Sequence, residues 1–94
     1  MKPSEVLRAA ATRLETHGWC QGSLSKDDRR CAKGALNHVG WDGPYLTWLD
    51  ACEEFLDDVG SRCIADWNDA PGRTAEEVIA QLRRTAERLE GEGR

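Results

Sequence analysis

The chain has few aromatic residues and no long apolar stretch. Only six of its 94 residues are aromatic, and four of those are tryptophan. No segment approaches the roughly 18 consecutive apolar residues of a membrane span. The charged N-terminal stretch also lacks the apolar segment of a secretory signal peptide. We therefore expect a cytoplasmic protein whose residues 1–94 form a single domain with one modest core.

The sequence also lacks the short motifs of the common enzyme classes. It contains no nucleophile elbow, phosphate-binding loop, dinucleotide fingerprint or His-Glu-x-x-His motif. His17 and Cys20 are three residues apart, but nothing nearby would orient the imidazole as the base of a nucleophilic pair. The sequence therefore predicts a protein that is not an enzyme and that uses no cofactor.

The four cysteines, Cys20, Cys31, Cys52 and Cys63, contain no close C-x-x-C pair of the kind that structural zinc sites use. Without a secretory signal, we expect the cytosol to keep them reduced. A free cysteine usually behaves as a small buried apolar residue. Buried thiols are therefore the favoured interpretation, and a small zinc-binding protein using Cys and His is an alternative.

The spacing of apolar residues predicts an all-α fold, because helical periodicity recurs and no useful strand alternation appears. Ser4 is the expected N-cap of the first helix and Pro44 suits the first turn of the third. Thr74 and Glu77 form a T-x-x-E capping box before the last helix. The four main helices are expected at residues 4–17, 28–38, 44–60 and after Thr74, with a further short helical turn at 61–67.

The third predicted helix has two distinct faces. Residues 42–69 hold eight acidic side chains and one basic one. One face of the helix is apolar and is expected to be buried: Tyr45, Trp48, Leu49, Cys52, Phe55, Leu56 and Val59. The other carries five carboxylates at helical spacing: Asp50, Glu53, Glu54, Asp57 and Asp58. This face is either simply solvated or a docking surface for a basic protein partner, and it would repel nucleic acid.

The segment "WNDAPGRTAEEV", residues 67–78, is explained mainly by turn and cap chemistry. Pro71 and Gly72 suit the central positions of a type II turn. Asn68 and Asp69 are expected to bond local backbone groups, and Arg73 is expected to pair with Asp69 or Asp66. The loop from Asn68 through Asp69 to Arg73 is also a second candidate contact surface for a partner.

The segment "KDDRRCAK" offers the basic residues Lys26, Arg29, Arg30 and Lys33, but two aspartates interrupt it. The sequence pI of about 5.1 argues against a dominant electrostatic footprint for nucleic acid. A nucleic-acid-binding accessory protein is therefore an alternative rather than the favoured interpretation.

The stretches "HGWCQG", "CAKGAL" and "WNDAPGRTAEEVIAQLRRTAE" resemble a family of short uncharacterised proteins from actinobacteria and their phages. The resemblance covers roughly residues 5 to 90 and is most specific at "WNDAPGRT". It implies an intracellular setting and a small accessory role, and it carries no catalytic residue or cofactor. The combined prediction is a non-enzymatic module that binds another protein, such as a host regulator in the phage setting, through the acidic helix face. The oligomeric state and the burial of Trp41 are left open.

Overall fold

The computed structural model describes residues 1–94 and is mostly helical, so the broad all-α prediction is confirmed. Helix α4 lies close to the expected short turn, whereas the small hairpin was not expected. None of the helices combines the length and the apolar character that a membrane span requires. The elements in chain order are α1 (Pro3–His17), β1 (Ser25–Lys26), β2 (Arg29–Arg30), α2 (Ala32–Gly40), α3 (Tyr45–Val59), α4 (Ile64–Asn68) and α5 (Ala75–Gly91).

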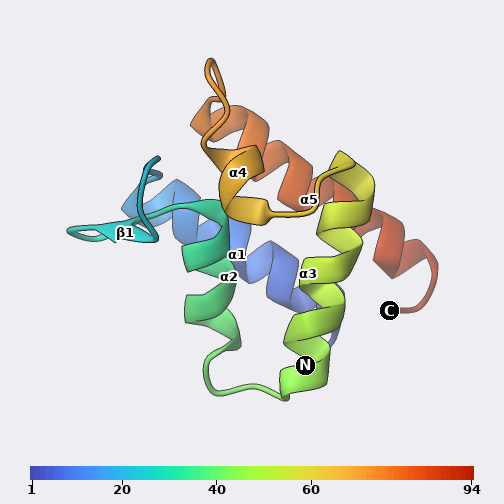
Figure 1. The fold of residues 1–94 in the computed structure, drawn as a ribbon. Coiled ribbons are helices and arrows are strands. Elements are labelled where there is room, and N and C mark those ends of the chain that lie inside the picture. The colour runs from blue at the N-terminus through green and yellow to red at the C-terminus, as the bar shows by residue number, and fades with distance from the viewer.

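The core forms where α1 and α5 lie antiparallel and α2 and α3 pack across them (Figure 1). The antiparallel direction follows from two ion pairs, since Arg8 contacts Glu90 while Glu15 contacts Arg83. The faces that α1 and α5 turn to the core are largely apolar and buried, as is Phe55 from α3. Trp19, Trp48 and Trp67 pack against the edge of this core and are only partly buried.

The start of α1 differs from the prediction. Pro3 is the first helical residue and Lys2 is the N-cap, so Ser4 lies inside the first turn and is buried. The N–H of Lys2 donates to the carboxylate of Glu5 at 2.7 Å, which ties the chain to the helix end. The backbone N–H at the first helical position has no partner within the helix, and proline has no N–H there to satisfy. Pro3 can therefore begin the helix one residue before Ser4.

Helix α2 begins at Ala32 instead of residue 28, because residues 25–30 form an antiparallel hairpin. The hairpin turns at Asp27, whose φ of 56° lies in the left-handed region. Cys31 then caps α2, since its Sγ accepts a hydrogen bond from the N–H of Gly34. Asp27 and Asp28 therefore lie in the turn of this hairpin and not in a helix.

Helix α3 matches the predicted helix closely and ends at Gly60, which adopts the left-handed conformation with φ 68°. Its apolar face is buried at Ala51, Cys52 and Phe55. Tyr45 was expected on that face but is 65% exposed. It occupies the first turn of α3, at the outer end of the interface with α2, where no core residue covers it.

Two further predictions concern α4 and α5. Cys63 was expected to point inward, but it precedes α4 as the N-cap residue and is exposed. The Thr74 cap is confirmed, because its Oγ1 accepts from the N–H of Glu77 at 3.2 Å. The Glu77 carboxylate accepts from the Thr74 hydroxyl, so the reciprocal bond of a capping box is not made. Gly72 has a φ of 82°, as the predicted type II turn requires.

Candidate functional site

The Asn68 side chain is completely buried and makes every hydrogen bond that an amide side chain can make. Its Oδ1 accepts from Trp19 Nε1 at 2.6 Å and from the N–H of Ala32 at 2.9 Å. Its Nδ2 donates to the Cys20 carbonyl at 3.1 Å and to Asp69 Oδ1 at 3.0 Å. Asn68 therefore joins the connector after α1, the start of α2 and the end of α4.

Neighbouring polar groups extend this junction. Gln21 donates to the backbone carbonyls of Asn68 and Ala70, and the N–H of Gly22 donates to Asp69 Oδ1. The hydrogen bond from Asn68, followed by the one from Gly22, lowers the pKa of the Asp69 carboxyl. The connector is thus fastened to the α4–α5 loop by side chains of both segments.

Arg73 does not pair with Asp69 or Asp66, and that prediction was wrong. Its Nε donates to the Trp67 carbonyl at 3.0 Å, and its guanidinium lies 4.1 Å from the centre of the Trp67 ring. It also forms an ion pair with Glu77 at 3.2 Å. A planar guanidinium can stack on an aromatic ring and donate in its own plane at once, so Arg73 fixes Trp67 from two directions.

The "WND" segment therefore has a structural role in the fold. Trp67 packs edge-on against Phe55, with ring centres 5.2 Å apart. Asn68 offers no exposed surface, so within this fold it has nothing to present to a partner. Of the predicted loop surface, only the exposed side of Asp69 and the half-buried Arg73 remain available.

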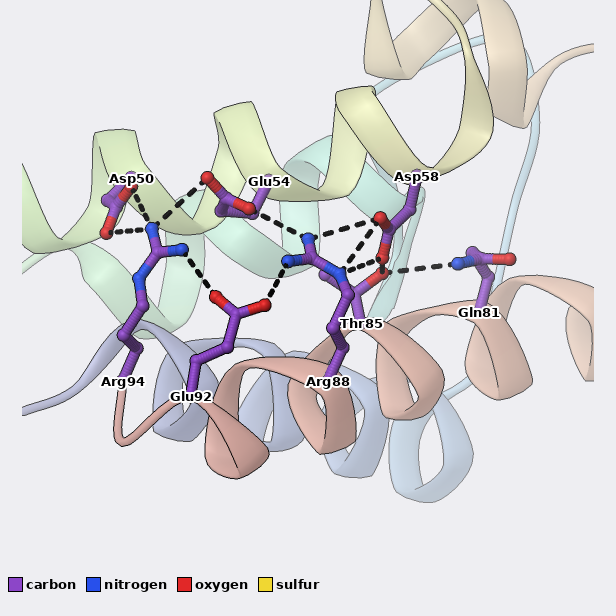
Figure 2. A network of polar contacts seen from close by, with 8 residues as sticks. All are labelled: Asp50, Glu54, Asp58, Gln81, Thr85, Arg88, Glu92 and Arg94. Atoms are coloured by element: carbon purple, nitrogen blue, oxygen red, sulfur yellow. Dashed lines mark hydrogen bonds and ion pairs between the residues drawn. The ribbon is translucent and has the colours of Figure 1, made fainter.

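The acidic face of α3 divides into two parts, and Figure 2 shows the paired part. Arg88 of α5 contacts Glu54 at 2.8 Å and Asp58 at 3.1 Å. Arg94 contacts Asp50 at 3.0 Å and Glu54 at 3.1 Å. Three of the five predicted contact carboxylates therefore hold α3 to α5 and the residues that follow it.

Other side chains of α5 and its end complete this network. Glu92 accepts from Arg88 at 3.0 Å and from Arg94 at 2.9 Å, and the buried Thr85 hydroxyl donates to Asp58 at 2.8 Å. The hydrogen bond from Arg88, together with the one from Arg94, holds the pKa of Glu54 below its ordinary value of 4.5. The ionised network therefore contributes to the packing of α3 on α5.

Glu53 and Asp57 form the unpaired part of the acidic face. Both are exposed, and neither makes an ion pair or a side-chain hydrogen bond. Leu46, which is 75% exposed, precedes them on the same face at spacings of seven and eleven residues. The outward face of α3 is thus apolar at its start and anionic further along.

An exposed apolar surface surrounds the turn between α2 and α3. Leu24, Trp41, Tyr45 and Leu46 are four of the five exposed large apolar side chains, and Met1 is the fifth. Trp41 is 83% exposed. Two surface hollows of about 400 and 390 Å³ both include Trp41 and Asn37 in their walls. We call these two hollows together the α2–α3 groove.

Two glycines shape this groove by allowing close contacts. A Cβ on Gly40 would lie 2.4 Å from Trp48 Cδ1, so the glycine lets the indole pack against the end of α2. A Cβ on Gly34 would lie 2.1 Å from the Leu24 carbonyl oxygen, so the connector rests directly on α2. Tyr45 then tilts against Trp48 with ring centres 5.5 Å apart. The positions of the aromatic side chains in the groove are therefore fixed by close backbone packing at these two glycines.

The groove also gathers polar atoms that have no partner. Four buried side-chain polar atoms in the chain lack a hydrogen bond, and three of them, Arg30 Nε, Asn37 Oδ1 and Trp48 Nε1, belong to groove residues. Sequence reasoning missed this surface. The available signal was the "GWDGP" turn, which carries a tryptophan where small polar residues are usual.

No three His, Cys, Asp or Glu side chains lie together in a way that would hold a metal ion. Cys20, Cys31 and Cys52 are buried thiols, whereas Cys63 is exposed. Burial raises the pKa of Cys52 to about 11 and also raises that of Cys31. Cys31 and Cys52 are therefore poor nucleophiles and poor metal ligands.

Comparison with known proteins gives a family assignment. Neither the curated proteins nor the solved structures compared with the chain include a match. The family described as "Family of unknown function (DUF6197)" matches residues 1–88. That match covers both the Asn68 junction and the α2–α3 groove, and the chain therefore belongs to the DUF6197 family.

Proposed function

We propose that the chain is a non-enzymatic module that binds another protein through the α2–α3 groove and the adjoining face of α3. The observation that carries this proposal is the gathering of exposed apolar side chains at Leu24, Trp41, Tyr45 and Leu46. Contiguous exposed apolar surface on a small domain typically marks an interaction site. Tryptophan and tyrosine are also the residues that most often dominate the binding energy of interfaces.

The free carboxylates of α3 define the charge of the partner. Glu53 and Asp57 lie beyond Leu46 on one face and have no cation of this chain opposite them. A basic partner surface would be steered toward them, and rim charges of this kind mainly raise the association rate. The acidic surface proposed for partner binding is therefore narrower than the five-residue stripe, because Asp50, Glu54 and Asp58 are engaged by arginines.

The test compares the parent with Trp41→Ala in affinity capture from the source organism, followed by binding measurements on purified components. A partner that uses this surface should lose about 30-fold in affinity for Trp41→Ala, the usual effect of a buried aromatic anchor. Glu53→Lys with Asp57→Lys should slow association and reduce its salt dependence. Glu76→Lys with Glu87→Lys is the matched control, because both are exposed carboxylates on α5 outside the ion pairs.

Equal capture of every partner by the parent and by Trp41→Ala would refute the proposal. Two results together would favour the nucleic-acid alternative instead. A random-sequence oligonucleotide would bind through the exposed Arg29 on the hairpin, and no protein partner would be lost when Trp41 is changed.

A further inference from the structure

We propose that one hollow of the α2–α3 groove binds the methylated ammonium group of a lysine side chain on the partner. This hollow has a volume of about 400 Å³, and we call it the aromatic hollow. It is lined by Asn37, Gly40, Trp41, Gly43, Tyr45 and Trp48. The inference rests on the proposed function, because it names the chemical group that the same surface recognises.

Aromatic rings form the apolar part of the wall of the aromatic hollow. Trp41, Tyr45 and Trp48 are half of the six aromatic residues of the chain. The rest of the wall consists of two glycines and an asparagine, so no aliphatic side chain lines the hollow. The face of an aromatic ring carries partial negative charge, and several rings around one hollow are the usual means of recognising an alkylated ammonium group.

The rings of the aromatic hollow are accessible to a ligand. Trp41 is 83% exposed and takes part in neither of the two ring–ring contacts of the chain. Tyr45 is 65% exposed and contacts Trp48, with an angle of 38° between the ring planes. Trp41 therefore offers free ring surface, and the Tyr45–Trp48 pair forms another part of the same wall.

One ring of the aromatic hollow already contacts a cation of the chain itself. Lys33 Nζ lies 4.8 Å from the centre of the Trp48 ring, within the distance of about 6 Å over which a ring face attracts a cation. Lys33 does not line the hollow, so its ammonium group does not fill it. Because Lys33 repels a second cation at Trp48, we assign the main contacts of the ligand to Trp41 and Tyr45.

The charges next to the aromatic hollow determine the sign of the ligand. The wall itself contains no ionised side chain, and Arg30 and His38 line only the neighbouring hollow. Asp42 follows Trp41 in the chain, is exposed and makes no ion pair. A cation held at Trp41 therefore gains from an unpaired carboxylate, whereas an anion would be repelled both by this carboxylate and by the ring faces.

The nature of the wall favours a methylated ammonium over a bare one. A lysine ammonium is compact and strongly hydrated, and the wall offers it no carboxylate in exchange for water. Methyl groups replace its N–H donors with apolar surface, which packs on the rings while the positive charge remains. Methylation therefore lowers the cost of leaving water and keeps the attraction to Trp41 and Tyr45.

Choline and its neutral carbon isostere, 3,3-dimethyl-1-butanol, test the role of the charge. The two probes have the same shape and differ in one central atom, which is nitrogen in one and carbon in the other. Each is titrated into the full chain, and binding is followed by NMR at the indole N–H signals, with the Trp41 signal assigned from Trp41→Phe. Choline should shift the Trp41 signal and bind about two- to fivefold more tightly for each ring that it contacts.

Glycine-flanked peptides with one lysine, trimethyllysine or arginine identify the source of the cation. The trimethyllysine peptide should bind about fivefold more tightly than the lysine peptide, and its aliphatic stem should make it bind more tightly than choline. Trp41→Ala and Tyr45→Ala should each weaken it by about two- to fivefold. Leu24→Ala should leave the affinity unchanged and is the matched control, because Leu24 is an exposed apolar residue that lines only the neighbouring hollow. Circular dichroism checks that the variants stay folded.

Other results would overturn the inference in distinguishable ways. Equal binding of choline and its isostere, or equal affinity for all three peptides, would refute recognition of a methylated cation and leave the proposed function intact. The same holds if a protein partner depends on Trp41 while no probe binds. Choline binding that is tighter than that of every peptide would replace the partner's side chain with a free small molecule. Trp41-dependent self-association in sedimentation would assign the hollow to a second copy of the chain. If no probe binds and no partner depends on Trp41, both proposals fail.

Discussion

Asn68→Asp replaces one buried donor with an acceptor while keeping the shape of the side chain. The retained oxygen can still accept from Trp19 Nε1 and from the N–H of Ala32. The other position, where Nδ2 now donates, faces the Cys20 carbonyl at 3.1 Å and Asp69 Oδ1 at 3.0 Å. A carboxylate oxygen placed there would face one carbonyl oxygen and one carboxylate.

The expected cost follows from these contacts. Leaving the buried Cys20 carbonyl without a donor costs about 1–3 kcal/mol. An uncompensated charge at a site with no exposed surface adds more, so the free energy of unfolding should fall by about 3 kcal/mol or more at neutral pH. Small domains have a total stability of about 5–15 kcal/mol, so this is a large fraction.

The pH dependence supplies an independent check. Burial and the nearby Asp69 would raise the folded-state pKa of the introduced carboxyl above its unfolded value of about 3.9. Its protonated form can donate to the Cys20 carbonyl. The penalty should therefore be complete above the raised pKa and should shrink as the pH falls through it toward the unfolded value of about 3.9.

Urea unfolding followed by far-UV circular dichroism measures both effects. Asn37→Asp is the matched control, because Asn37 Oδ1 has no hydrogen bond to lose and the side chain is partly exposed. It should cost less than about 1 kcal/mol. Equal stability of Asn68→Asp and the parent at neutral pH, or a loss at Asn37 as large as at Asn68, would refute the structural role assigned to the junction.

Three further predictions concern backbone contact, thiol reactivity and acid stability. Gly34→Ala should destabilise the chain by about 2 kcal/mol or more, because the new Cβ would lie 2.1 Å from the Leu24 carbonyl oxygen. Gly91→Ala is the control: its Cβ would meet nothing within 4 Å, so it should stabilise the chain by up to about 1 kcal/mol. Thermal unfolding measures both effects. Cys63 should react with a thiol reagent in the native state while the other three cysteines react only after unfolding, and fast titration of all four thiols would contradict the burial described above. Because the folded-state pKa of Glu54 lies below 4.5, its contribution to stability should be complete above about pH 5 and should decline as the pH falls through that lowered pKa. Glu54→Gln should therefore make the free energy of unfolding fall less steeply with decreasing pH. An unchanged slope would show that Arg88 and Arg94 do not stabilise the fold through Glu54.

The features that could be predicted from the sequence are local ones. The Thr74 cap and the Gly60 end of α3 depend on residues within one turn of each other, so the spacing alone identifies them. The hairpin at residues 25–30 could not be recognised, since strands of two residues are too short to show alternation. The Asn68 junction joins residues 36 to 49 positions apart, and no periodicity encodes such contacts.

The candidate site shows the same division. The spacing placed the five carboxylates on one face of α3, but the arginines that neutralise three of them lie 30 to 44 positions later in the chain. Periodicity assigns side chains to a face and leaves open what covers that face. For the same reason the exposure of Trp41 could not be decided, because it depends on how the α2–α3 turn closes over Trp48.

The antiparallel pairing of α1 and α5 has a consequence for synthesis on the ribosome. The two ion pairs that align these helices join residues 82 and 68 positions apart, and the core side chains of α5 extend to Leu89. The side of α1 that packs on α5 is therefore covered only after residues up to about Leu89 have been translated. Completion of the core is therefore expected as a late event in folding.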